Sequence, residues 1–121
     1  MMKTAILTLM LLVGFCAAEE PEDLNAAVTH LLKETGESGA TFIRNKKSHD
    51  AKEAAEHMKK KYEHFVKKGK IKTAEDFIRL AATKSLISGK PYKLKLPDGT
   101  EHLTAEWMTE ALKTYREQTA Q

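Results

Sequence analysis

Apolar residues recur every three or four positions along most of the chain, which is the spacing of helices that bury one face. The pattern covers four stretches: residues 21–35, 49–68, 73–88 and 104–116. On the second and longest stretch, one stripe is formed by Ala51, Ala55, Met58, Tyr62 and Phe65. Ser48 and Thr104 stand at the starts of the second and fourth stretches, and we expect them to be the N-caps.

A different pattern separates the third and fourth helices. Residues 92–96 alternate between apolar and basic side chains, Pro97-Asp98-Gly99 is a strong turn signal, and residues 100–103 can return. This predicts a β-hairpin whose Tyr92, Leu94 and Leu96 face the helices. We therefore expect an α+β domain, mainly α, with about four helices and a β-hairpin between the third and the fourth.

The first eighteen residues have the layout of a secretory signal peptide. Lys3 gives a positive start, residues 5–14 are apolar, and small residues precede a cleavage point between Ala18 and Glu19. The apolar run is too short for a stable membrane anchor. We expect a mature single domain of residues 19–121, periplasmic or secreted and without a transmembrane anchor.

The only cysteine, Cys16, falls inside this leader. A lipoprotein signal acylated at Cys16 is the alternative, but Phe15 stands where such signals carry a small residue. Without Cys16 the mature domain has no disulfide and depends on its hydrophobic core. The whole chain has a net charge of only +3, to which Lys3 contributes one. So small a charge on an exported protein argues against a nucleic-acid partner.

Three groups of polar residues are candidates for chemistry, and the first is Arg44-Asn45 after the extended pair Phe42-Ile43. A guanidinium can clamp a carboxylate through two hydrogen bonds. That carboxylate could belong to a ligand, but the favoured interpretation is an internal ion pair with Glu75 or Glu53.

The second group is His49, Glu53 and His57, spaced four residues apart. Neighbouring members could share a metal, but the two histidines are about 12 Å apart along a helix. All three lie opposite the apolar stripe. The favoured interpretation is a solvated helix face, with a binding surface as the alternative and no metal site predicted.

The third group runs from Ser85 to Tyr92. Ser88-Gly89-Lys90 looks like part of a phosphate loop, but it ends a helix instead of opening one, so the helix dipole disfavours an anion. Gly89 and Pro91 explain most of the segment as a helix end. Anion or peptide binding by Ser88, Lys90 and Tyr92 stays open. A serine nucleophile would need a base within hydrogen-bond reach.

Five motifs occur in an order and spacing that resemble the YfeK-like family, a group of small exported bacterial proteins. They are Phe42-Ile-Arg-Asn45, Glu53-Ala54, His57-Met-x-x-Lys61, Thr73-Ala-Glu-x-Phe-Ile78 and Ser85-x-x-Ser-Gly-Lys-Pro-Tyr92. No activity is established for that family, so the resemblance implies export and a shared fold, and it draws attention to the polar motif residues. Lys46 is a departure, because family members often have glycine after the asparagine.

These features predict a non-enzymatic binding or accessory module for an anionic or peptide ligand or an envelope protein. One alternative is a small hydrolase or transferase that uses Ser85 or Ser88 with His57 as the base. Another is a purely structural envelope protein. No catalytic set, metal or cofactor is predicted. The candidate binding residues are Arg44, Asn45, Glu53, His57, Ser85, Ser88, Lys90 and Tyr92.

Overall fold

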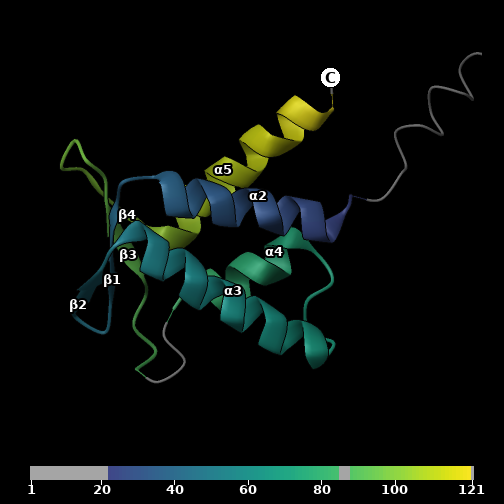
Figure 1. The fold of residues 1–121 in the computed structure, drawn as a ribbon, viewed down its shortest axis with the longest axis horizontal. Coiled ribbons are helices and arrows are strands. Elements are labelled where there is room, and N and C mark those ends of the chain that lie inside the picture. The colour runs from purple at the N-terminus through teal and green to yellow at the C-terminus, as the bar shows by residue number, and fades with distance from the viewer. Residues whose placement is uncertain (1–21, 85–87, 121) are drawn as a thin grey trace, which may run out of the picture.

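A computed structural model describes residues 22–84 and 88–120 (Figure 1). Its helices are α2 (Leu24–Glu37), α3 (Ala51–Lys67), α4 (Ala74–Phe77), which continues as the π-helix η1 (Ile78–Ala82), and α5 (Thr104–Thr119). Its strands are β1 (Thr41–Arg44), β2 (Lys47–His49), β3 (Lys93–Lys95) and β4 (Glu101–Leu103). The α+β class with a majority of helix is confirmed. The predicted signal peptide and Ser85 lie outside the described residues.

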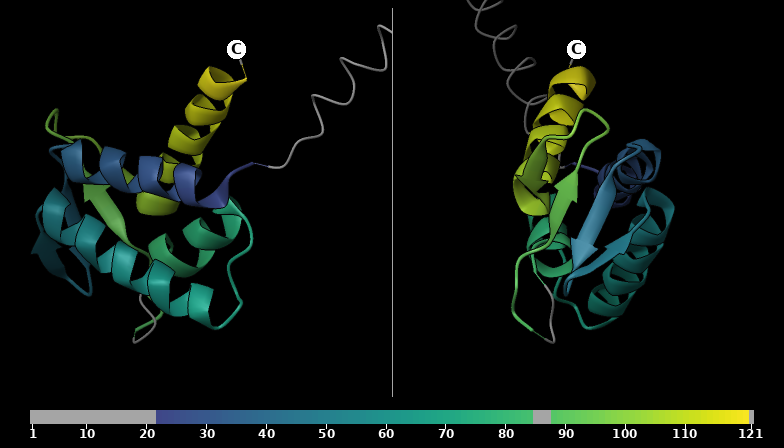
Figure 2. Two further views of the ribbon diagram at one scale, coloured as in Figure 1. Left: turned by 45° about the vertical axis from the view of Figure 1, so that its right-hand side comes forward. Right: turned by 90° about the vertical axis from the view of Figure 1, so that its left-hand side faces the viewer.

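The strands form one antiparallel sheet in the order β2-β1-β3-β4. The prediction of one hairpin between the third and fourth helices therefore missed half of the sheet. β1 and β2 lie between α2 and α3, and β1 inserts between β2 and β3. The sheet stands at one end of the molecule, and α2 and α3 extend away from it (Figures 1 and 2).

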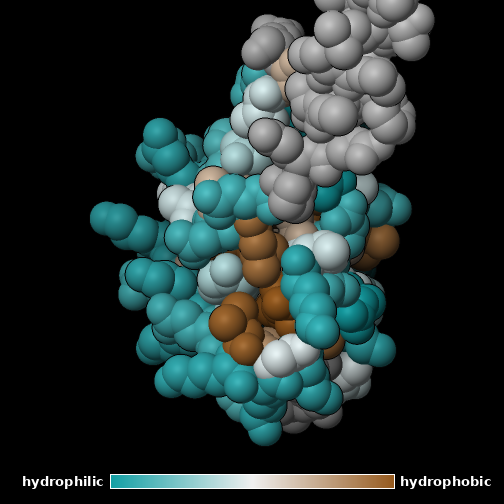
Figure 3. All heavy atoms as spheres, turned by 90° about the vertical axis from the view of Figure 1, so that its right-hand side faces the viewer, coloured by the Kyte–Doolittle hydropathy of each residue, from teal (hydrophilic) through white to brown (hydrophobic). Residues whose placement is uncertain are grey.

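All four helical segments contribute to one core behind the sheet. The largest fully buried apolar side chains are Val28 and Leu31 of α2, Phe77 of α4, Leu94 of β3 and Met108 of α5. Figure 3 shows the opposite end of the molecule, where apolar side chains lie in a recess bordered by hydrophilic ones. Within the described ranges, no helix is long and apolar enough to cross a membrane.

Tyr92 and Leu94 are buried as the alternating pattern predicts, and Lys93 and Lys95 between and after them are exposed. Leu96 packs partly buried against the core. The hydrophobic alternation therefore identified the helix-facing side of β3 correctly.

Three predicted helix boundaries were wrong. Ser48 belongs to β2, and Asp50 caps α3 in a capping box with Glu53. Thr104 is the first residue of α5, whose N-cap is Leu103. The third helix ends as a π-turn near Ala82, well before Gly89.

Candidate functional site

The pairing of β1 with β3 brings Arg44 and Tyr92 to the same side of the sheet. Phe42 is the partner of Leu94 in this pair, and both are buried on the side that faces the helices. Side chains alternate along a strand, so Arg44 and Tyr92, each two residues from that pair, share this side. His49 of β2 is the other partner of Phe42 and joins them.

The start of α3 closes a small cavity over these residues. Glu53 and His57 lie one turn apart on α3, so both reach the cavity. About 40 Å³ inside it is open to water-sized molecules, which is room for a few waters at roughly 10–15 Å³ each. The cavity is lined by Phe42, Ile43, Arg44, His49, Glu53, Ala54, His57, Met58 and Tyr92.

Lys61, one turn after His57, contacts Tyr92, which lines the cavity. Its ammonium group donates a 3.0 Å hydrogen bond to the phenol oxygen of Tyr92 and lies 5.0 Å from the centre of that ring. Only 9% of Lys61 is exposed, and among the described residues it forms no ion pair with a carboxylate. Tyr92 therefore accepts from Lys61 and keeps its own hydroxyl hydrogen for another acceptor.

The one carboxylate in the cavity wall already has a structural partner. Glu53 Oε1 accepts a 3.2 Å hydrogen bond from the backbone N–H of Asp50 as part of the α3 capping box. Nε2 of His49 is buried and lacks a hydrogen-bond partner within the described part of the chain. Arg44 likewise forms no ion pair among those residues, although an internal one was predicted.

Positive charge dominates this site and changes its titration. Burial, followed by the charges of Arg44, Lys61, His49 and Lys60, lowers the pKa of His57 to about 4. Burial and the nearby guanidinium of Arg44 lower the pKa of Lys61 to about 8. His57 is therefore neutral at pH 7, and Lys61 loses its proton far more readily than an ordinary lysine.

The structure brings together four of the eight candidate residues: Arg44, Glu53, His57 and Tyr92. The interpretation of the His49–His57 face as solvated holds for Glu53, which is exposed, and only in part for His49 and His57, which are partly buried where they line the cavity. His49 and Lys61 were not among the candidates. Lys61 lies on the same side of α3 as the buried Ala54 and Met58, but lysine is rarely buried, so its sequence position alone did not mark it; His49 ends a strand that was not predicted.

The other described candidates form a separate contact between two loops. Ser88 Oγ donates a short hydrogen bond to Asn45 Oδ1 and accepts one of 3.2 Å from the backbone N–H of Lys90. Lys90 is exposed. This contact joins the β1–β2 turn to the segment that leads into β3.

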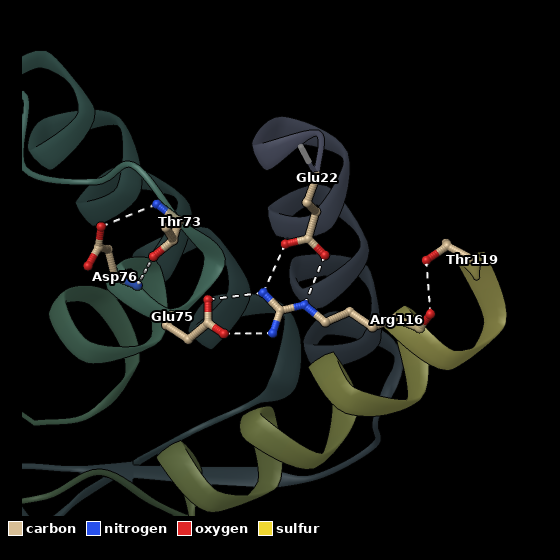
Figure 4. Close-up of polar contacts among 6 residues, drawn as sticks. All are labelled: Glu22, Thr73, Glu75, Asp76, Arg116 and Thr119. Atoms are coloured by element: carbon tan, nitrogen blue, oxygen red, sulfur yellow. Dashed lines mark hydrogen bonds and ion pairs between the residues drawn. The ribbon is translucent and has the colours of Figure 1, made fainter. Parts of the chain in front are cut away.

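Glu75, the other partner proposed for Arg44, is engaged elsewhere. Arg116 of α5 binds the carboxylates of Glu75 and Glu22, each through two hydrogen bonds of 2.6–3.0 Å (Figure 4). These bonds with Arg116 hold the pKa of Glu75 below its usual value. The cluster connects the chain before α2 with α4 and with the outer half of α5.

No group of three described histidine, aspartate or glutamate side chains is arranged to hold a metal ion. The cavity offers hydrogen-bond donors, positive charge and an apolar wall. It can therefore accept a small group that carries negative charge.

Comparison with known proteins agrees with the resemblance noted in the sequence. A relative described as "Uncharacterized protein YfeK" from Salmonella typhimurium is 36% identical over 75 residues, which cover 62% of this chain and 58% of the relative. No solved structure matches the chain. A model of a family of unknown function, DUF5329, matches residues 22–116. The chain therefore belongs to the DUF5329 family of unknown function, and it is similar to YfeK.

Proposed function

We propose that this protein is a non-enzymatic binding module whose β1–α3 cavity takes up a small anionic group. The observation that carries the proposal is the meeting of Arg44 with two histidines in the wall of a cavity whose one described carboxylate caps a helix, with the buried Lys61 bonded to Tyr92 of the same wall. Like charges brought together out of water repel one another, and a bound anion would relieve that repulsion.

The donors around the cavity favour this ligand class. The guanidinium of Arg44 presents several N–H groups in one plane, and the phenol of Tyr92 retains a hydrogen to donate. Charge-assisted hydrogen bonds from a partly buried guanidinium are among the stronger polar interactions in proteins.

The test is a titration of the mature domain with formate, acetate, phosphate and sulfate at constant ionic strength. Saturable shifts of the amide NMR signals of Arg44, His57 and Tyr92 are expected, with a rise in the melting temperature. Arg44→Met should abolish both effects. Lys47→Met is the matched control, because Lys47 is the exposed strand partner of Arg44 and lies outside the cavity. Unchanged spectra with every anion would overturn the proposal.

The hydrolase alternative is less well supported. It needs a serine hydroxyl that gives its proton to His57, whereas the Ser88 hydroxyl donates to Asn45. The structural alternative predicts that Arg44, His57 and Tyr92 matter for stability and that anions do not bind, so the same titration separates it from the proposal.

The proposed binding takes place outside the cytoplasm, after removal of residues 1–18. The charge and apolar pattern of those residues supports export. Expression of the full chain in a Gram-negative host and N-terminal sequencing of the periplasmic product test this. We expect the product to begin at Glu19, and a product that still begins at Met1 would contradict export by cleavage.

A further inference from the structure

Building on the proposed anion binding, we infer that the group held in the cavity is a carboxylate on a short apolar chain, the chemistry of acetate or propionate. Tetrahedral anions such as phosphate and sulfate carry more oxygens than the cavity can satisfy. Polar side chains form one part of the cavity wall and apolar side chains form the rest.

The polar part of the wall suits two oxygens. The planar fork of Arg44 matches the two oxygens of a carboxylate, and the Tyr92 hydroxyl adds one more donor. His49 contributes its buried Nε2, which has no partner within the described ranges, as a further polar contact. Glu53, already bound to the N–H of Asp50, would repel any extra anionic oxygen placed near it.

The remaining wall is apolar. Phe42, Ala54 and Met58 line it and are only 4%, 8% and 3% exposed, so they belong to the core. An oxygen held against these side chains would lose its hydrogen bonds to water without replacement. A methyl or ethyl group at the same place would gain from burial.

The size of the cavity limits the apolar chain. About 40 Å³ open to water-sized molecules leaves room for only a few heavy atoms. Longer chains would have to displace Met58 or Ala54, which are fixed by core packing. Affinity should therefore pass through a maximum at two or three carbons.

The experiment compares formate, acetate, propionate and hexanoate with phosphate and sulfate by amide NMR titration of the mature domain. Acetate or propionate should bind about tenfold more tightly than the tetrahedral anions, and hexanoate should bind more weakly than propionate. Phosphate or sulfate binding as tightly as acetate would overturn this inference and leave the broader anion proposal standing. If no anion binds, both proposals fail.

A variant that changes only the apolar wall makes the test specific. Ala54→Val narrows the cavity and should weaken propionate binding about tenfold or more while formate is affected less. Ala26→Val on the exposed side of α2 is the matched control, because it places the same branched side chain in a helix away from the cavity. Equal weakening of formate and propionate by Ala54→Val would contradict the assignment of that wall. Thermal melting of both variants establishes that they are folded.

Discussion

Lys46 occupies a backbone conformation that suits glycine. The turn between β1 and β2 has two residues, Asn45 and Lys46, with φ angles of 53° and 66°. Two consecutive left-handed residues are characteristic of a type I′ hairpin turn, for which Asn-Gly is the favoured sequence. Asparagine tolerates this conformation, but a lysine there is strained by its Cβ atom.

Replacing Lys46 with glycine should therefore stabilise the protein. We expect Lys46→Gly to raise the free energy of unfolding by about 0.5–1 kcal/mol, since relief of the strain exceeds the entropy that glycine adds to the unfolded chain. Urea unfolding measures the change. Lys47→Gly, in the adjoining strand, should destabilise instead, and equal effects of the two variants would contradict the turn assignment.

Thr104 holds a hydroxyl in the core that has no partner among the described residues. The residue is fully buried, and Oγ1 forms no hydrogen bond with the described residues, although its backbone N–H donates to the carbonyl of Tyr92. Thr104→Val keeps the shape and removes the orphan group, so stability should rise by about 1 kcal/mol.

Urea unfolding of Thr104→Val beside Thr109→Val checks this expectation. Thr109 is exposed and its hydroxyl donates to the carbonyl of Ala105, so its replacement should change stability little. A clear loss of stability in Thr104→Val would mean that the hydroxyl has a partner after all.

Among the elements, those whose periodicity lies within one continuous segment were predictable. The alternation of β3 indicated its buried face directly from sequence, and the apolar stripe of α3 identified Ala51, Met58 and Phe65 correctly, whereas Ala54 is buried in place of Ala55. β2 lacked such a signal, because Lys47-Ser48-His49 contains no apolar residue. It becomes a strand through the turn at Asn45 and its pairing with β1.

The cavity could not be predicted from any single segment of the sequence. Arg44 meets Tyr92 through the register of β1 with β3, which are about fifty residues apart in the chain. On α3, Lys61 lies on the same side as the buried Ala54 and Met58, and its ammonium group bonds to Tyr92, which comes from a distant part of the chain. The sequence therefore supplied half of the site residues but neither their convergence nor the burial of Lys61.

The outer half of α5 is connected to the body by the Tyr115 ring, which packs against His30 and the core, and by ion pairs. Its last buried residue is Leu112, and beyond it Arg116 forms the ion pairs with Glu22 and Glu75 (Figure 4). Arg116 is 40% exposed, so Arg116→Met should lower global stability by only about 1 kcal/mol. Amide hydrogen exchange in residues 113–119 should accelerate more strongly, since local opening no longer breaks these bonds.

The matched control for this element is Arg79→Met. Arg79 pairs with Asp76 three residues earlier and connects no separate elements. Hydrogen exchange in α5 should be unchanged in this variant. If both variants accelerate amide hydrogen exchange in α5 equally, the Arg116 cluster does not hold the helix in place.

At the scale of the whole molecule, the cavity region brings together basic groups whose charges repel one another. Arg44 and Lys61 are close enough for each to affect titration nearby, and no described carboxylate pairs with either. Such an arrangement lowers the stability of the unliganded protein. Residues that lower the stability of the fold and also line a cavity are typical of a functional site.

The burial of His57, together with the same charges, makes stability depend on pH. Its pKa is about 4 in the folded protein and about 6.5 when unfolded, so between these values the unfolded chain binds more protons. Stability is thus fully present above pH 6.5 and falls as the pH drops towards 4. A tenfold difference in proton affinity corresponds to about 1.4 kcal/mol. Because His57 is partly exposed, the whole loss of stability should be only about 2 kcal/mol.

The charged and titratable groups around His57 come from several elements: Arg44 of β1, His49 of β2, Glu53, Lys60 and Lys61 of α3, and Tyr92 before β3. Because the pKa of His57 is lowered in the folded protein, the free energy of unfolding in urea should fall more steeply from pH 7 to pH 4 for the parent than for His57→Gln. His64→Gln, at an exposed position on the same helix, should keep the slope of the parent. Acetate is avoided as a buffer, since an anion in the cavity would offset the charge of Arg44 and allow His57 to take up a proton. Parallel curves for the parent and His57→Gln would show that the imidazole is not held neutral by its neighbours.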